Sequence, residues 1–169
     1  TSNSQTYNAI DMADDGTFVV VWQSLSQDTS SYGIFGQRFN ADGTKAGSEF
    51  QVNTYTSNSQ YTPNVAMEAD GDFIVVWQSS GQDGSSDGIY GQRHNADGTT
   101  TGSEFRVNTY TDSYQLEPSI AALSGGGFVV SWTSYYQDGG GSYGVFAQRY
   151  ANDGTPLGGE FRVNTTTAS

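Results

Sequence analysis

One segment of about 55 residues occurs three times in succession and fills the chain of 169 residues. Trp22, Trp77 and Trp132 mark the period, since each lies 55 residues after the one before it. A repeat of this length builds one supersecondary unit several times, and neighbouring units bury each other's apolar faces. A residue that occurs in one copy only is therefore a weak candidate for the main activity. We expect one structural unit made of three repeats, residues 1–56, 57–111 and 112–169.

Each repeat predicts four short strands joined in meander order. In the second repeat the expected strands span 63–69, 73–77, 89–94 and 104–108. Their counterparts in the other repeats span 18–22, 34–39, 49–53, 128–132, 145–150 and 160–164. Asp-Gly or Gly-Gly dipeptides precede the second strands, and such dipeptides supply the positive φ angles of tight hairpins. No window shows helical periodicity, so we expect an all-β fold with antiparallel sheets.

The second strand of each repeat indicates how the sheets pack. Its first copy, FVVVW at 18–22, does not alternate apolar with polar residues, as a strand with one wet face would. Sheets stacked face to face, like the blades of a propeller, cover both faces of such a strand. A β-trefoil also uses three four-stranded units and stays open as the alternative. Because a small residue recurs in the third strand, we expect Trp22 to cover Gly36 across the hairpin.

Composition narrows the classes of partner. The chain has 18 acidic and six basic residues and no cysteine, for a net charge of −12. That charge repels nucleic acids and anionic membrane surfaces, so neither is an expected partner. No apolar run approaches the roughly 20 residues of a membrane-spanning helix. Few lysines and many Ser, Thr, Asn, Gly and Tyr residues indicate an extracellular or cell-surface bacterial protein.

Several short motifs recur together in each repeat. In the first copy they are WQS at 22–24, QD at 27–28, GQR at 36–38 and GSEF at 47–50. The whole run resembles repeats of very large secreted bacterial proteins, namely adhesins and RTX-type proteins. That resemblance implies propeller-blade-like units in series, and it covers nearly the whole chain. The glycine- and aspartate-rich nonapeptide calcium repeat of RTX proteins is absent from this sequence.

Three blades leave two apolar outer faces, because closed propellers have four to eight blades. The sequence begins and stops at the same phase of the repeat: residues 1–5 match 56–60, and 163–165 match 52–54. The end of one copy can therefore meet the start of another as the first repeat meets the second. We expect other copies of the chain as partners, arranged head-to-tail in a closed ring or a filament. A fragment cut from a longer chain is the third possibility.

An arginine and a glutamate recur in every repeat at a spacing of eleven residues. The pairs are Arg38 with Glu49, Arg93 with Glu104, and Arg149 with Glu160. Centred on an Asp-Gly turn, this spacing predicts cross-strand ion pairs worth about 0.2–1 kcal/mol each if exposed. A calcium loop of the EF-hand type is excluded here, because an arginine occupies the position of its first acidic ligand.

Loop aspartates form a second recurring set. Asp28, Asp83 and Asp138 each follow a glutamine, and the second repeat adds Asp87 nearby. Such residues cap turns through their own main chain or bind calcium in loops, and turn capping is the favoured interpretation. The sequence therefore predicts no cofactor, with calcium at these loop aspartates as the alternative. Asn164 begins an Asn-Thr-Thr acceptor pattern for N-linked glycan.

Familiar catalytic sets are missing from the sequence. The single histidine, His94, occupies a position held by Phe39 and Tyr150 in the other repeats, which predicts an aromatic packing role. Without cysteine or a second histidine, no nucleophile–base triad can be assembled. Tyrosines in or near loops suit sugar rings or pack at blade rims; they are Tyr32, Tyr55, Tyr61, Tyr110, Tyr114, Tyr135, Tyr136 and Tyr143.

The resulting hypothesis is a non-enzymatic extracellular protein with a structural or adhesive role, assembled from stacked blades. Two alternatives remain. A multivalent carbohydrate-binding module would use the loop tyrosines. A propeller glycoside hydrolase would use pairs of carboxylates, which this acidic sequence does not exclude.

Overall fold

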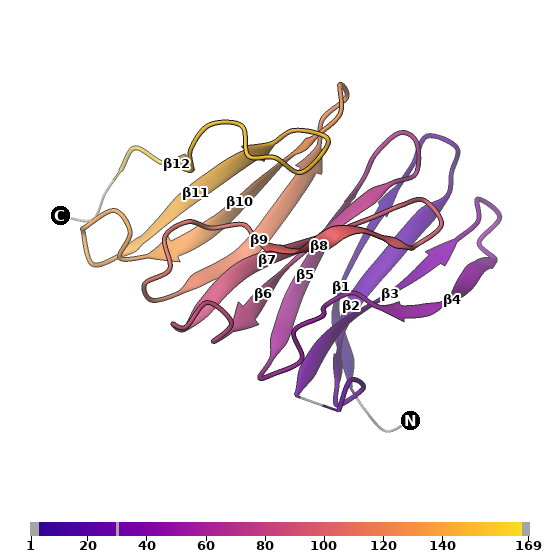
Figure 1. The fold of residues 1–169 in the computed structure, drawn as a ribbon, viewed down its shortest axis with the longest axis horizontal. Helices are drawn as coiled ribbons and strands as arrows, with labels where there is room; N and C mark the ends of the chain where they lie inside the picture. The colour runs from indigo at the N-terminus through magenta and orange to yellow at the C-terminus, as the bar shows by residue number, and fades with distance from the viewer. Residues whose placement is uncertain (1–3, 30, 167–169) are drawn as a thin grey trace.

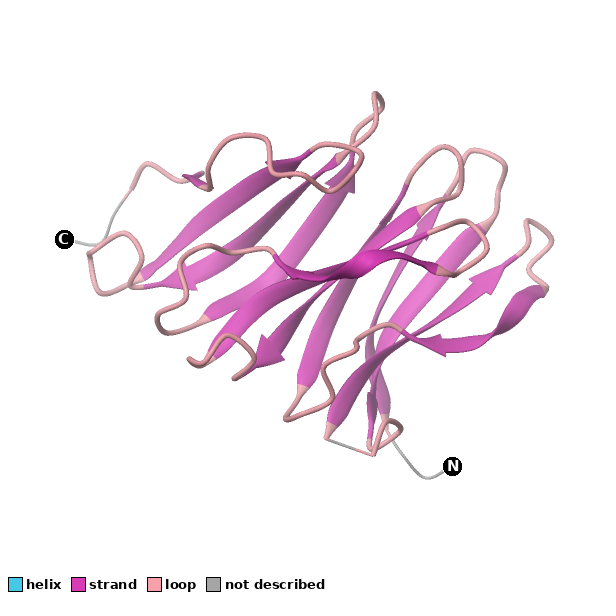
Figure 2. Cartoon of the chain, viewed as in Figure 1, coloured by secondary structure: helices cyan, strands magenta, loops and turns pink. Residues whose placement is uncertain are grey.

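Twelve strands form three separate four-stranded sheets in the computed structural model, which describes residues 4–29 and 31–166 (Figures 1 and 2). The first sheet contains β1 (Gln5–Met12), β2 (Phe18–Leu25), β3 (Tyr32–Phe39) and β4 (Lys45–Gln51). The second contains β5 (Gln60–Met67), β6 (Phe73–Ser80), β7 (Asp87–His94) and β8 (Thr100–Arg106). The third contains β9 (Gln115–Ala122), β10 (Phe128–Tyr135), β11 (Tyr143–Tyr150) and β12 (Phe161–Arg162).

Every sheet is an antiparallel meander, with its strands in chain order. The prediction of an all-β chain with three four-stranded antiparallel sheets is confirmed, and the arrangement is consistent with a propeller-like fold. Figure 1 shows the second sheet between the other two, with the faces of the sheets toward one another. The β-trefoil alternative does not apply, because the strands of each repeat form one separate sheet and none of them pairs with a strand of another repeat. No helix long and apolar enough to cross a membrane occurs in residues 4–29 and 31–166.

Two hydrophobic clusters fill the spaces between the sheets. The cluster between the first and second sheets includes Val19, Val21, Phe73, Val75 and Trp77. The cluster between the second and third sheets includes Ile74, Val76, Phe128, Val130 and Trp132. Alternate side chains of β6 therefore enter opposite clusters, which explains why its sequence is apolar without alternation. Each fully buried large side chain contributes about 1.5–3 kcal/mol.

The recurring tryptophans face the preceding sheet. Trp77 and Trp132 are 0% and 1% exposed, whereas Trp22 is only half-buried, because residues 4–29 and 31–166 form no sheet against its side of the first sheet. The expectation that Trp22 covers Gly36 is wrong, since Trp22 pairs with Phe35 while Val21 pairs with Gly36. The hairpin register is shifted by one residue from the expected one, and such a shift moves a side chain to the other face.

A phenylalanine of the fourth strand covers the small residue instead. A Cβ atom added to Gly36 would lie 2.7 Å from the ring of Phe50, and one added to Gly91 would lie 2.8 Å from the ring of Phe105. In the third sheet Ala147 pairs with Phe161. The glycines thus allow the phenylalanine ring to lie close to the third strand while it also packs against the next sheet.

Replacing Gly91 by alanine should destabilise the protein. The added methyl group must displace the ring of Phe105, and such overpacking costs about 1–3 kcal/mol. Gly125→Ala is the matched control, because nothing lies within 4 Å of that position. Urea unfolding followed by tryptophan fluorescence measures both variants, and equal midpoints would contradict this packing.

Candidate active site

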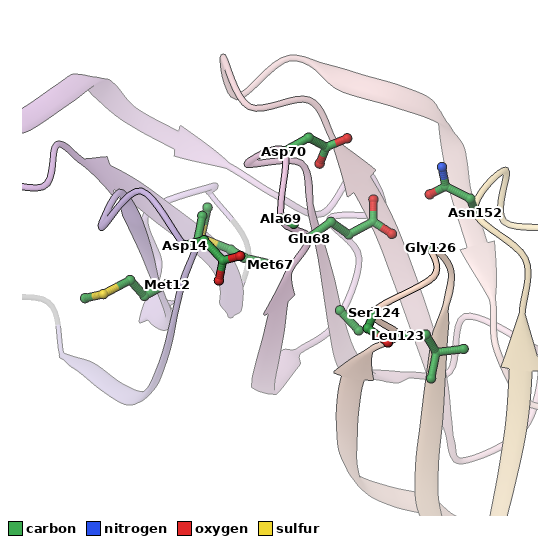
Figure 3. Close-up of a pocket in the computed structure, with 12 residues that line it drawn as sticks. Met12, Asp14, Met67, Glu68, Ala69, Asp70, Leu123, Ser124, Gly126 and Asn152 are labelled. Carbon is green, nitrogen blue, oxygen red and sulfur yellow. The ribbon is translucent and has the colours of Figure 1, made fainter.

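Three turns meet at one end of the stacked sheets. They connect β1 to β2, β5 to β6 and β9 to β10, and they occupy equivalent places because every sheet is the same meander. The three turns line a pocket of about 520 Å³, to which Asn152 adds a side chain from the turn after β11. Figure 3 shows residues of all three sheets around this pocket. A concave site built by several sheets is the usual place for a ligand in such a fold.

Carboxylates gather on the middle turn. Glu68, Asp70 and Asp72 each place a carboxylate oxygen within 4.8 Å of the others. Asp72 is held in place, since its Oδ1 accepts a hydrogen bond of 2.8 Å from the Ala96 amide. Asp14 of the first sheet also lines the pocket (Figure 3). Glu68, Asp70 and Asp14 therefore reach one cavity from two sheets.

Glu68 differs electrostatically from an ordinary surface glutamate. Partial burial and the negative charge of Asp70 raise the pKa of Glu68, and the nearby Arg93 only partly offsets this. The Asn152 amide nitrogen, in the orientation that satisfies its hydrogen bonds, lies 3.1 and 3.2 Å from the two Glu68 carboxylate oxygens. Glu68 thus keeps its proton to a higher pH than a free glutamate does. A carboxyl group with a raised pKa beside a second carboxylate is the arrangement used for general acid–base chemistry.

The same three carboxylates are the one group in the described part of the chain that is spaced to hold a metal ion. Calcium and magnesium prefer such oxygen ligands. Calcium at the loop aspartates stays a prediction.

Glu68 was not recognised in the sequence as a site residue. It occurs in one repeat only, where the other two have Ala13 and Leu123, and a residue of a single repeat is a weak candidate on periodicity alone. The sequence nevertheless contains a signal for this site, namely an acid at a turn position that is apolar in the other two repeats. Equivalent turns converge at one end of such a stack, so an acid found in a single repeat makes an asymmetric site there.

The structure does not bring together the arginine and glutamate of each repeat. In the first sheet Arg38 pairs with Ala46 and Gly36 pairs with Phe50, so the register shifts at a bulge between these pairs and Glu49 does not lie opposite Arg38. Glu49 accepts a hydrogen bond from Gln27 instead. The Asp-Gly turn suggested a regular hairpin, and the extra bulge residues could not be read from the spacing.

The other glutamates bind the preceding linker. Glu104 accepts hydrogen bonds from Thr54 N at 2.7 Å and from Gln82 Nε2 at 2.5 Å. Glu160 accepts the equivalent bonds from Thr109 and Gln137. The threonine bonds join consecutive sheets, whereas the glutamine bonds stay within one repeat, because Gln82 and Gln137 lie in the loops between the second and third strands of the same sheets.

The arginines likewise reach the next sheet. Arg38 donates a hydrogen bond to the carbonyl oxygen of Ala96 in the second sheet. Arg93 lies against the turn of the third sheet, where a Cβ atom added to Gly154 would be 3.4 Å from its Cδ. Arg149 belongs to the third sheet, the last one within the described residues, and it is exposed.

The loop aspartates occupy separate turns. Asp83 accepts a hydrogen bond of 3.1 Å from Ser85 N, and Asp138 accepts one of 3.2 Å from Gly140 N. Asp28 accepts a bond of 3.5 Å from Gln51 Nε2. Asp87 lies on β7, where the Tyr61 hydroxyl donates to it at 2.7 Å. Asp83 and Asp138 thus accept from the main chain two residues further on, as turn-capping aspartates do.

Asn164 uses its side-chain amide within the protein. Its Oδ1 accepts a hydrogen bond of 2.8 Å from Val145 N, and its Nδ2 donates to Thr166 O at 2.6 Å. Asn53 and Asn108 make the same contacts in the other repeats. Attachment of a glycan to Asn164 stays a prediction.

His94 packs as an aromatic side chain. Its ring stacks on Phe73 with centroids 4.8 Å apart, and 2% of the residue is exposed. Burial lowers the pKa of His94 to about 4, only partly offset by the Gly98 carbonyl group. The buried Nε2 atom has no hydrogen-bond partner.

Comparison with solved structures gives likenesses to carbohydrate-active enzymes. A GH43_1 enzyme from Xanthomonas citri complexed with xylose matches over 96% of this chain and 56% of its own, with TM-score 0.62 and 12% identity. An endo-1,4-beta-xylanase from Bacteroides thetaiotaomicron matches over 98% and 63%, with TM-score 0.60 and 12% identity. An endo-arabinase from the same organism matches over 95% and 63%, with TM-score 0.56 and 14% identity. This chain thus spans less than two thirds of each.

No family model and no curated protein matches the sequence. At 12–14% identity the structural likenesses show the fold. They nevertheless correct two hypotheses. The similar structures are glycoside hydrolases and not adhesin or RTX-type repeats, so the resemblance suggested by the repeat motifs is wrong. The non-enzymatic adhesive or structural role is contradicted by the same finding.

His94 should make the stability of the protein fall in mild acid. The unfolded chain binds a proton near pH 6.5, whereas folded His94 does so only near pH 4. The stabilising contribution is therefore complete above pH 6.5 and is lost as pH falls toward 4, by at most about 3 kcal/mol. His94→Phe, which copies the residue of the first repeat, should remove this part of the pH dependence. Unfolding midpoints between pH 4 and 7 measure it, and parallel curves for the two proteins would contradict it.

Proposed function

We propose that this protein hydrolyses glycosidic bonds in the pocket lined by Glu68, Asp70 and Asp14. The observation that carries the proposal is the position of Glu68, a partly buried acid with a second carboxylate within 4.8 Å, at the convergent end of three sheets. Glycosidases use two carboxyl groups, one of which protonates the leaving oxygen while the other acts as base or nucleophile. The fold likeness to glycoside hydrolases supports the same chemistry.

Glu68 is assigned as the proton donor, because burial and the charge of Asp70 raise its pKa above the ordinary glutamate value. Asp70 and Asp14 are the two carboxylates that can act as the second group. Asp70 belongs to the same turn as Glu68, whereas Asp14 reaches the pocket from the neighbouring sheet. The names of the similar enzymes refer to xylan and arabinan, which makes pentose glycosides the first substrates to examine.

Glu68→Gln should lower the turnover of aryl xylosides or arabinosides by about 100-fold or more, the usual size of a general-acid contribution. Wild-type activity should fall as pH rises through the pKa of Glu68, which lies above the ordinary glutamate value of 4.5. Glu117→Gln, an exposed glutamate of β9, is the matched control. Release of nitrophenol measures the rates. The proposal fails if wild-type protein cleaves no xyloside, arabinoside or xylan, or if both variants retain full activity.

A second candidate function is carbohydrate binding at a tyrosine cluster. Tyr135 packs against Tyr136 and Tyr143, with ring centroids 4.3 and 4.7 Å apart. Tyr136 and Tyr143 are 51% and 53% exposed, at the end of β10 and the start of β11, away from the turn that lines the pocket. Tyr136 has a φ of 68°, an unfavourable conformation for a bulky residue, at the position of Ser26 and Gly81 in the other repeats. An exposed aromatic ring in a strained conformation favours a binding role.

Tyr136→Ser should weaken binding of xylo-oligosaccharides by about tenfold, because one stacking ring is lost. The fold should not be destabilised, because the substitution relieves backbone strain at this position. Tyr7→Ser is matched to it, since Tyr7 is 66% exposed and has a φ of 52°. Isothermal titration calorimetry measures both variants. Equal affinity of the two variants and the wild type would contradict the tyrosine site.

A further inference from the structure

Two loops, with the strand ends beside them, contain buried oxygen atoms without a hydrogen-bond partner. The loops connect β6 to β7 and β10 to β11, and each has a serine hydroxyl, a glutamine carbonyl and an aspartate carboxylate of this kind. The atoms are Ser79 Oγ, Gln82 Oε1 and Asp83 Oδ2 in the second sheet, and Ser134 Oγ, Gln137 Oε1 and Asp138 Oδ2 in the third. Buried polar atoms are rarely left unpaired, and a carboxylate oxygen also needs compensation of its charge.

A glycine at the start of the third strand makes room for the carboxylate. A Cβ atom added to Gly88 would lie 2.7 Å from Asp83 Oδ2. Gly88 pairs with Ser79 across the hairpin, just as Gly144 pairs with Ser134. Paired residues of antiparallel strands have side chains on the same face, with Cβ atoms about 4.5–5.5 Å apart. The Ser79 side chain, which is 0% exposed, therefore lies on the same side of the hairpin as the Asp83 carboxylate.

An asparagine oxygen belongs to the same set. A Cβ atom added to Gly144 would lie 3.4 Å from Asp138 Oδ2 and 3.6 Å from Asn164 Oδ1, so both oxygens lie beside one point. Asn164 Oδ1 accepts one hydrogen bond, from Val145 N at 2.8 Å, and a carbonyl oxygen has two lone pairs. Asn108 Oδ1 accepts the equivalent bond in the second sheet.

A neighbouring carboxylate fixes the orientation of the glutamine. Gln82 Nε2 donates to Glu104 Oε1 at 2.5 Å, and Gln137 Nε2 donates to Glu160. An ionised carboxylate only accepts hydrogen bonds, so the amide nitrogen has to face it. The glutamine carbonyl oxygen is therefore directed elsewhere, where it has no donor.

The electrostatic surroundings of the second-sheet loop are negative. Burial and the negative charges of Asp83 and Glu104 raise the pKa of Tyr90 to about 12, and Arg106 only partly offsets this. A negative potential of this kind favours a cation over a neutral ligand.

The first sheet pairs the equivalent serine and aspartate. Ser24 Oγ accepts a hydrogen bond of 3.3 Å from Gln5 Nε2, and Asp28 Oδ2 accepts one of 3.5 Å from Gln51 Nε2. The loop of the first sheet thus satisfies these two oxygens with side chains of its own repeat, and it serves as an internal comparison.

The equivalent donors of the second sheet are engaged elsewhere. Gln60 Nε2 donates to Ser57 O at 2.9 Å, while Gln60 Oε1 accepts a bond of 3.2 Å from Asn53 Nδ2 in the preceding linker. Arg106 Nε donates to Asn108 O at 3.0 Å. The serine and aspartate oxygens therefore stay accessible to a ligand that bridges them.

We propose that each of these two loops binds one calcium ion, at Asp83 in the second sheet and at Asp138 in the third. The serine and glutamine oxygens of the same loop are its other protein ligands, and water completes the coordination. Calcium accepts about six to eight oxygen ligands in irregular geometry, whereas magnesium demands a near-ideal octahedron. These sites are distinct from the three carboxylates of the turn at Glu68, because each loop combines a single carboxylate with neutral oxygens. The proposal does not rest on the proposed function.

The composition of the site predicts its affinity and its effect. One carboxylate for each ion gives weak binding, about 10⁻⁴–10⁻³ M, as in extracellular calcium modules. Gln82 also donates to Glu104, which accepts a bond from Thr54 N of the preceding linker. An ion that holds this loop therefore also supports the contact between consecutive sheets, and it should stabilise the fold.

Urea unfolding with and without calcium tests the proposal. At about 10 mM calcium and a dissociation constant of about 1 mM, each site should raise the folding equilibrium constant about tenfold, and two sites about 100-fold. Asp83→Asn and Asp138→Asn should each lose a factor of about ten, and the double variant should gain nothing from calcium. Asp28→Asn removes the same charge from the equivalent loop of the first sheet and should keep the full gain. Sodium chloride of equal ionic strength gives the reference value.

Three results of this experiment would overturn the proposal. The first is a wild-type chain whose stability calcium does not change. The second is a double variant that keeps the calcium gain, because the ion then binds elsewhere, for example at the turn that contains Glu68. The third is an Asp28→Asn variant that loses as much of the gain as Asp83→Asn does.

Nuclear magnetic resonance of the wild type covers the case in which a variant does not fold. Circular dichroism melts in calcium-free buffer show whether each variant is folded. When calcium is added to the wild type, the largest amide shifts should occur in residues 79–88 and 134–144. Largest shifts in residues 68–72, or equal shifts along the whole chain, would also overturn the proposal.

Discussion

Burial of each strand's alternate side chains in two different interfaces is the constraint on which this structure depends. In β6, Phe73, Val75 and Trp77 face the first sheet, while Ile74 and Val76 face the third. A single sheet of this composition has no core of its own. Its stability comes from the sheets on either side, as in other repeat proteins. The outermost faces are the places where this requirement is not met within one chain.

The polar residues of the repeat serve the same stacking. Glutamates and arginines that seemed to pair within one hairpin bind the linker or turn of an adjacent sheet instead, as Glu104 does with Thr54 and Arg38 with Ala96. Each such contact fixes the position of one sheet relative to the next. Equivalent turns are thereby kept at one end of the stack, where the pocket forms. The scaffold interactions and the candidate site are therefore consequences of one repeated interface.

The candidate site departs from the repeat. Its acid Glu68 replaces an alanine and a leucine of the other copies, and its partner Asn152 comes from a different sheet. A repeated framework supplies the convergent turns, and substitutions in single copies supply the chemistry. The periodicity of the sequence predicts the scaffold. It does not identify the residues that make the site, because equivalence in sequence does not show which equivalent positions meet in space.

The sequence by itself determined the three repeats, the four strands of each and the need for cover on both faces, because these follow from periodicity and local apolar pattern. It also assigned His94 to an aromatic position. Only the tertiary structure decided which residues meet. A one-residue shift of the hairpin register put Phe50 rather than Trp22 over Gly36, and a bulge took Glu49 away from Arg38. Register and bulges depend on packing between sheets that are about 55 residues apart in the chain, which no local pattern records.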